Sequence, residues 1–153
     1  MRRTRGPSAI ARVLEVSFLV ALPFLCHYLI PVMIIVPKPY TYLGIMPLVG
    51  GLALATWASM LFRKAGTSFQ LHGESSSLVT SGPFQFSRNP MYLGMLVWLL
   101  GLAVLLGSLV SFLFPLLLFL VANFYIVPLE EKSMERLCGM QFADYKQRVR
   151  RWL

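Results

Sequence analysis

The chain has 153 residues, of which 57% are hydrophobic and only 13% are charged, and its mean hydropathy is +0.68. Soluble domains carry about a quarter charged residues, so this composition excludes an ordinary soluble domain, and the length suits a single domain. The formal net charge is +8, but the basic residues gather at the ends of apolar segments. A protein surface that faces anionic lipid explains such a charge, so no nucleic-acid partner is expected.

The first structural signal is the spacing of the charges. No Asp, Glu, Lys or Arg occurs in residues 16–37, 39–62 or 89–129. A membrane-spanning helix needs roughly 20 apolar residues, so the first two stretches suit one crossing each. The third suits two crossings, with a turn at Gly107-Ser108. Because backbone groups in lipid must be hydrogen-bonded internally, we predict an all-α integral membrane protein. The chain should form one membrane domain, 1–153, with four spans at about 13–36, 42–62, 90–106 and 109–129.

The N-terminus has two interpretations. Arg2, Arg3 and Arg5 precede an apolar stretch, as they would in a signal peptide. That stretch is longer than a signal-peptide core and no small-residue cleavage site follows it, so we expect a retained membrane anchor. Thirteen of the 14 Lys and Arg then lie on one side of the membrane, and only Lys38 lies on the other. The positive-inside rule predicts a multi-pass protein with both termini in the cytoplasm.

The connection between the second and third spans, residues 63–89, is too long and polar for a simple turn, which favours a functional role. Asn89-Pro90 then suits the N-cap and first position of the third helix. The fourth span ends at Glu130-Glu131, where the helix dipole disfavours negative charge by ~0.3–1 kcal/mol and nearby lipid adds a further cost. Either the two carboxylates pair with Lys132 or Arg136, or they meet a cationic ligand.

The C-terminal tail has an apolar stripe at helical spacing, with Lys and Arg on the other faces. The stripe consists of Met134, Cys138, Phe142, Tyr145, Val149 and Trp152. We therefore predict an interfacial amphipathic helix that lies on an anionic inner leaflet, with Gly139 as a candidate break. Cys26 and Cys138 form no CxxC or Cys/His cluster, so neither a disulfide nor a metal site is expected.

Two blocks of the sequence resemble a known family. Residues 78–94 read LVTSGPFQFSRNPMYLG, and Glu130-Glu131 is followed by Gly139, Tyr145 and Val149. In this order, on either side of an apolar hairpin, the blocks are similar to the signature of the isoprenylcysteine carboxyl methyltransferases and the related phospholipid methyltransferases. The resemblance covers about residues 66–152.

This resemblance implies S-adenosylmethionine as the cofactor, held by segments at about 66–94 and 123–150. The implied cofactor-binding residues are Ser76, Ser77, Leu78, Val79, Phe84, Arg88, Asn89, Pro90, Met91, Tyr92, Glu130 and Glu131. Carboxylates and aromatic faces can hold the cofactor's sulfonium and ammonium, and capped helix N-termini and Asn can supply donors to its carboxylate and ribose. No residue is assigned to catalysis itself.

The chain departs from the family pattern at three places. Many members have His at the position of Asn89 and Tyr at the position of Phe84, and isoprenylcysteine enzymes have a substrate-binding Arg one turn before the Glu pair. Here that neighbourhood, residues 123–128, has no cation, which leaves Asn123 and Tyr125 as the candidate acceptor-binding residues. The implied function is methyl transfer to a lipid-like or small hydrophobic acceptor that partitions into the membrane.

Two other interpretations stay open at this stage. One is a non-catalytic four-helix membrane protein, such as a small transporter or an assembly factor. A proton-coupled transporter would usually have an acidic residue in the middle of a span, and none of the four has one. The other is a family member that binds the cofactor without activity.

Overall fold

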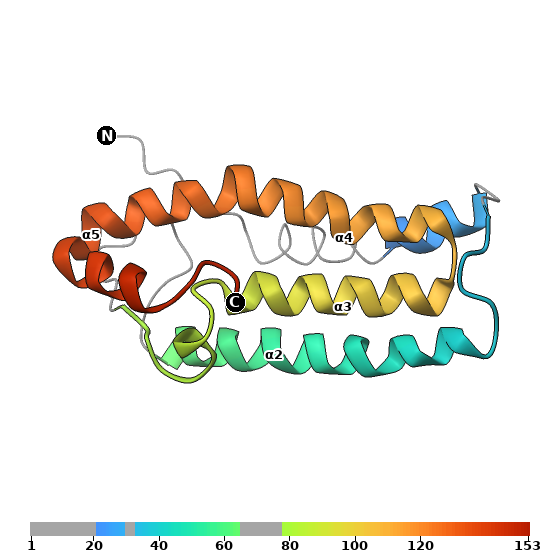
Figure 1. Ribbon diagram of the computed structural model, residues 1–153, viewed down its shortest axis with the longest axis horizontal. Coiled ribbons are helices and arrows are strands. Elements are labelled where there is room, and N and C mark those ends of the chain that lie inside the picture. The colour runs from blue at the N-terminus through green and yellow to red at the C-terminus, as the bar shows by residue number, and fades with distance from the viewer. Residues whose placement is uncertain (1–20, 30–32, 65–77) are drawn as a thin grey trace.

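The computed structural model describes residues 21–29, 33–64 and 78–153, and its helices run side by side along one long axis (Figure 1). Residues 21–29 are helical. The labelled elements are η1 (Tyr40–Gly44), α2 (Ile45–Lys64), η2 (Gly82–Gln85), α3 (Pro90–Leu106), α4 (Leu109–Val121), η3 (Ala122–Ile126) and α5 (Val127–Arg148). The predicted all-α class is therefore confirmed for the described residues.

Small residues let η1 and α2 approach α3 closely. Gly44 and Gly51 face Gly101 and Gly94, and a methyl group added to Gly94 would come within 2.6 Å of the backbone nitrogen of Ala55. No larger side chain fits between the two backbones at these positions. This packing does not depend on a hydrophobic driving force, which is weak between helices in lipid.

Gly107 joins α3 to α4 and fixes the segment that leads into η1. It has φ 71°, a left-handed conformation suited to glycine, and its carbonyl accepts hydrogen bonds from the N–H groups of Ile35 (2.8 Å) and Val36 (3.1 Å). Ile34 forms an isolated antiparallel bridge with Ser108. Residues 33–36 are not helical, so the prediction of a first helical span that continues to residue 36 is wrong at its end.

The fourth predicted span is continuous with the tail helix. α4 passes through one π-helical turn, η3, into α5, and the N–H of Val127 bonds to the carbonyl of Ala122. Pro128 follows directly; it has no N–H and its ring crowds the carbonyl four residues earlier, which favours such a widened turn.

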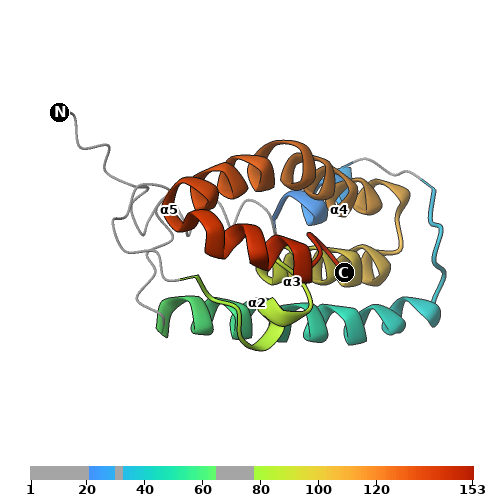
Figure 2. The ribbon, with the colours of Figure 1, turned by 60° about the vertical axis from the view of Figure 1, so that its left-hand side comes forward.

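Gly139 kinks α5 with φ 48° and ψ −120°, as predicted, and the helix folds back over the end of the bundle (Figure 2). The apolar stripe of the tail does not lie free for lipid, however. Phe142, Tyr145 and Val149 are buried against one another, and Met134, Cys138 and Leu78 pack around them. For these three buried residues the predicted contact with lipid is wrong, because the protein itself covers them, while a contact of the rest of the tail helix with the inner leaflet stays a prediction.

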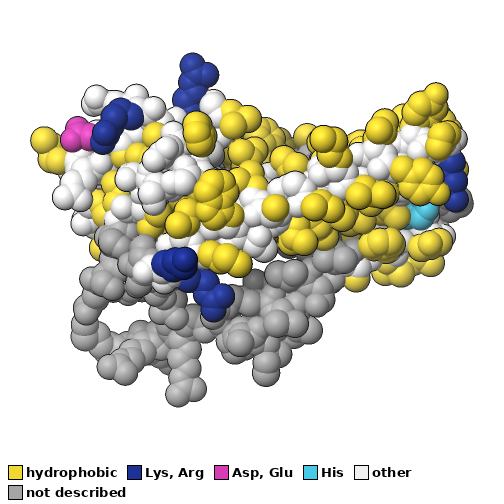
Figure 3. Space-filling model, turned by 90° about the horizontal axis from the view of Figure 1, so that it is seen from below, with side chains coloured by type: hydrophobic (Ala, Val, Ile, Leu, Met, Phe, Trp, Pro, Cys, Tyr) yellow, Lys and Arg dark blue, Asp and Glu magenta, His cyan; other side chains and the backbone are white. Residues whose placement is uncertain are grey.

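By length and composition, two of the described helical stretches could cross a membrane, Tyr40–Lys64 and Leu109–Arg148. α3 is apolar and has the predicted bounds, but its 17 residues extend only about 25 Å. On the face drawn in Figure 3, hydrophobic side chains gather over the middle and right-hand part of the described surface, and Lys and Arg lie in the left-hand half and at the right-hand edge. These features agree with an integral membrane protein, while the number of four spans stays a prediction.

Candidate functional site

A polar cluster forms where the start of α3 meets α5. Its first contact is between Tyr92 and Glu130: the phenol donates a hydrogen bond to the carboxylate Oε1 at 2.8 Å. Both side chains are half-buried. Among the described residues no ion pair includes Glu130. A carboxylate with a neutral partner in a partly dry position favours a cation nearby.

Glu131 differs from its neighbour because two arginines engage it. Nη2 of Arg151 lies 2.7 Å from Oε2, and Nη1 of Arg88 lies 3.0 Å from Oε1. Arg88 forms an ion pair with Glu131, but the geometry of this contact is not that of a hydrogen bond. The Nε of Arg88 is buried and has no acceptor among the described residues. The expected alternative pairing with Lys132 or Arg136 does not occur. The side chain of Arg88 is nearly buried.

The chain after α5 returns to the start of α3, where the C-terminus lies in Figures 1 and 2. We call residues 149–152 the C-terminal strap. The carbonyl of Arg150 accepts a hydrogen bond from the N–H of Arg88 at 3.0 Å. The carbonyl of Arg151 accepts from the side-chain amide of Asn89 at 3.1 Å and from the hydroxyl of Ser87 at 3.3 Å. The strap therefore covers the beginning of α3.

Asn89 occupies the N-cap position of α3, and Pro90 is the first helical residue, as predicted. The side chain of Asn89 makes no cap hydrogen bond, however, because its amide donates to the strap. Its own N–H bonds to the hydroxyl of Ser87 at 3.1 Å. The expectation that Asn89 caps the helix through its side chain is therefore wrong.

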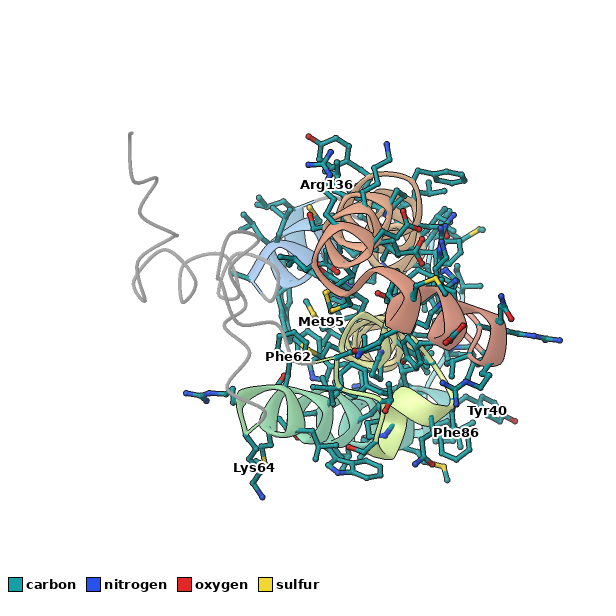
Figure 4. All side chains as sticks on the ribbon, turned by 90° about the vertical axis from the view of Figure 1, so that its left-hand side faces the viewer. Tyr40, Phe62, Lys64, Phe86, Met95 and Arg136 are labelled. Atoms are coloured by element: carbon teal, nitrogen blue, oxygen red, sulfur yellow. The ribbon has the colours of Figure 1, made fainter. Side chains whose placement is uncertain are left out.

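The short helix η2 brings Phe84 against the same end of the bundle. Phe84 is buried, its ring stacks on Phe62 of α2 with centroids 6.2 Å apart, and its carbonyl accepts a 2.6 Å hydrogen bond from the phenol of Tyr145. Figure 4 looks onto this end: Lys64 and Arg136 lie on the outside, whereas Met95 lies toward the middle of the bundle. α5 thus holds η2 in place through Tyr145.

The two candidate acceptor residues lie in the π turn and differ in exposure. Asn123 accepts a 3.0 Å hydrogen bond from the indole N–H of Trp152. The Trp152 ring packs on Phe119 with centroids 5.4 Å apart. Tyr125 is 68% exposed on the outer surface of the helix. Only Asn123 therefore belongs to the cluster.

The structure brings together most of the residues that the sequence predicts for the cofactor site. Contacts at this end of the bundle include Phe84, Arg88, Asn89, Tyr92, Glu130 and Glu131. Leu78 packs against the buried tail cluster, while Pro90 is buried and Val79 and Met91 are half-buried nearby in the chain. Ser76 and Ser77 lie outside the described residues.

Sequence reasoning missed the strap. In the sequence Arg151 is only one of several basic residues of the tail, and Trp152 is only the last residue of the apolar stripe. The π turn was missed as well, although Pro128 inside a continuous apolar run is a signal for it.

Comparisons with known proteins agree with this architecture. The sequence model of the phospholipid methyltransferase family matches residues 39–141. Protein-S-isoprenylcysteine O-methyltransferase B of Arabidopsis thaliana is 35% identical over 78 residues, which are 50% of this chain and 39% of that protein. An uncharacterized protein of Haemophilus influenzae is 38% identical over 63 residues, 41% of this chain and all of that protein.

A solved structure of a eukaryotic intramembrane Ras methyltransferase, isoprenylcysteine carboxyl methyltransferase, has the same fold. The TM-score is 0.62 at 24% identity, covering 95% of this chain and 52% of that one. The chain thus spans about half of the solved structure and less of the Arabidopsis relative. The family model covers more than half of the chain, from before α2 into α5, so this protein is an integral membrane member of the phospholipid methyltransferase family.

Proposed function

We propose that the protein transfers the methyl group of S-adenosylmethionine to a lipid-like or membrane-partitioned acceptor. The observation that carries the proposal is the Tyr92–Glu130 contact: a half-buried carboxylate, held by a phenol, at the end of an apolar helix. Membership in a methyltransferase family supplies the reaction class.

The residues of the cluster fit the chemistry of this cofactor. Glu130 offers a negative charge that no described ion pair uses, which suits an ammonium or a sulfonium. Phe84 adds a buried aromatic ring at the same end of the bundle, and aromatic faces attract cations. Glu131 is a weaker candidate than its neighbour, since Arg88 and Arg151 already engage its two oxygens.

In this mechanism S-adenosylmethionine supplies a methyl group bound to a positively charged sulfur, ready for in-line displacement. The chain contributes position and a dry environment. Glu130 would bind the cationic part of the cofactor, and Tyr92 fixes the Glu130 carboxylate through its hydrogen bond. The Arg88–Glu131–Arg151 cluster holds the start of α3, α5 and the strap together around them.

Calorimetric titration of S-adenosylmethionine into the purified protein in detergent tests the cofactor site. Glu130→Gln keeps the shape and removes the charge; a hydrogen bond to a charged group contributes about 1.5–3 kcal/mol, so affinity should fall roughly ten- to hundredfold. Glu135→Gln is the matched control, because Glu135 is exposed and pairs with Lys146 outside the cluster. Equal affinity in the wild-type and Glu130→Gln proteins would remove Glu130 from the site.

The acceptor is expected to be uncharged or to have an amine. Asn123 offers only neutral hydrogen bonds, and both Arg88 and Arg151 are engaged by Glu131. We therefore expect little methylation of the carboxylate of a farnesylated cysteine analogue. The test offers radiolabelled cofactor with prenylcysteines, aminophospholipids, small thiols and fatty acids. Labelling of the prenylcysteine alone would contradict this expectation, and no labelling at all would favour a binding protein without activity.

A further inference from the structure

The C-terminal strap places the indole of Trp152 beside the polar cluster, on the side that faces α4. Arg151 is anchored at both ends: its carbonyl accepts from Asn89 and its guanidinium binds Glu131. The next residue, Trp152, donates to Asn123 and packs on Phe119. The strap thus extends from the boundary carboxylates to the π turn.

The position of Asn123 is unusual for a polar residue. It is a half-buried amide in an apolar helical stretch, within a π turn, and such turns occur frequently at functional sites. Glu130 follows seven residues later on the same continuous helical run, about 10 Å along the axis. Trp152 donates a hydrogen bond to Asn123, and Arg151 pairs with Glu131, the residue next to Glu130. The strap therefore lies along this helical run from Asn123 to Glu131.

We infer that Trp152 is a specificity-determining residue: its ring forms the membrane-side wall of the path by which the acceptor reaches Glu130. The inference rests on the proposed function for the existence of an acceptor. The indole N–H is already bound to Asn123, so the ring presents an apolar face. Trp152 is half-buried, and a rigid ring that lines such a path would hinder a branched alkyl chain more than a linear one.

A fluorescence experiment tests the location of the wall without turnover. The full chain with Trp57→Phe and Trp98→Phe retains Trp152 as its one tryptophan. A dibrominated monoacylglycerol should quench it saturably, and the unbrominated parent should reverse the quenching. The matched control retains Trp98, in the middle of α3, and should show only gradual, unsaturated quenching. The same unsaturated quenching in both proteins would overturn the inference.

A selectivity experiment tests the role of the ring. With linear and branched acceptors of the same head group, Trp152→Ala should raise the branched-to-linear ratio of kcat/KM about tenfold, within the range that apolar pockets achieve. Trp152→Phe and Trp98→Phe should keep the ratio of the wild type. Asn123→Ala, which removes only the amide that holds the indole, should shift the ratio in the same direction as Trp152→Ala.

Calorimetry with S-adenosylmethionine separates the two hypotheses. Retained cofactor affinity with an unchanged ratio in both Trp152→Ala and Asn123→Ala would overturn the wall and leave the proposed function intact. A wild-type protein that binds no cofactor would overturn the proposed function. The quenching experiment would then be the only test of whether Trp152 lines a path for a lipid-like molecule. If Trp152→Ala does not fold, Asn123→Ala carries the selectivity test.

Discussion

Tyr92 on α3 and Glu130 on α5 are 38 positions apart in the chain, yet the phenol donates a 2.8 Å hydrogen bond to the carboxylate. This contact joins the two sequence blocks of the family at one end of the bundle. The ion pair of Arg88 with Glu131 joins the segment just before α3 to α5 as well. The hydrogen bond from Tyr92 fixes the Glu130 carboxylate, which is proposed to bind the cofactor. The ion pair of Arg88 with Glu131 fixes α5, the helix to which Glu130 belongs.

The first prediction concerns Tyr92. Tyr92→Phe removes the hydrogen bond but leaves the charge of Glu130, so affinity for S-adenosylmethionine should fall less than in Glu130→Gln, by roughly two- to tenfold. Calorimetry measures the loss. Tyr42→Phe is the control, because that exposed phenol lies in η1, at the other end of α2. A loss of the same size in both variants would mean that Tyr92 has no special role.

The second prediction concerns the ion cluster. Glu131→Gln leaves Arg88 nearly buried without its counter-charge, and the free energy of unfolding should fall by about 3–5 kcal/mol. Arg151→Gln should lower it by only about 1 kcal/mol, because the Arg151 side chain is 34% exposed and solvent screens its charge. Thermal unfolding in detergent measures both. Glu135→Gln, on the exposed surface, should leave the melting temperature unchanged; equal effects of all three would contradict a structural cluster.

The third prediction uses two adjacent glycines of α2. A methyl group at Gly51 would meet the backbone of Trp98 and Gly94, whereas one at Gly50 would meet nothing within 4 Å. Gly51→Ala should force the helices apart and cost about 1–3 kcal/mol of unfolding free energy. Gly50→Ala should be neutral or stabilise the helix by up to about 1 kcal/mol. The opposite order of melting temperatures would show that α2 and α3 do not pack in this register.

The fourth prediction concerns the membrane orientation, which rests on the distribution of Lys and Arg. Single cysteines at Lys38 and Lys146, in a background without Cys26 and Cys138, would be treated with an impermeant thiol reagent in right-side-out vesicles. The cysteine at position 38 should react and the one at position 146 should be protected until the vesicles are opened. Reaction at position 146 in sealed vesicles would reverse the orientation.

Local sequence determined the bounds of α3 and the end at which the site lies. Pro90 favours a helix start and Gly107 a helix end through their own backbone preferences, so Pro90–Leu106 agrees with the predicted 90–106. The uncharged stretches indicate apolar helices in any packing arrangement. The two family blocks indicate Phe84, Arg88, Tyr92 and Glu130 as candidate site residues from the sequence alone.

Only the tertiary structure decided which partners these residues take. Glu131 pairs with Arg88 and Arg151 rather than with the nearby Lys132 or Arg136, and Asn89 binds the strap rather than its own helix. The apolar stripe of the tail could equally have rested on lipid, since periodicity indicates that a face is apolar but not what covers it. Contacts between segments distant in the sequence depend on how the helices fold back on one another, and no local pattern in the chain encodes that return.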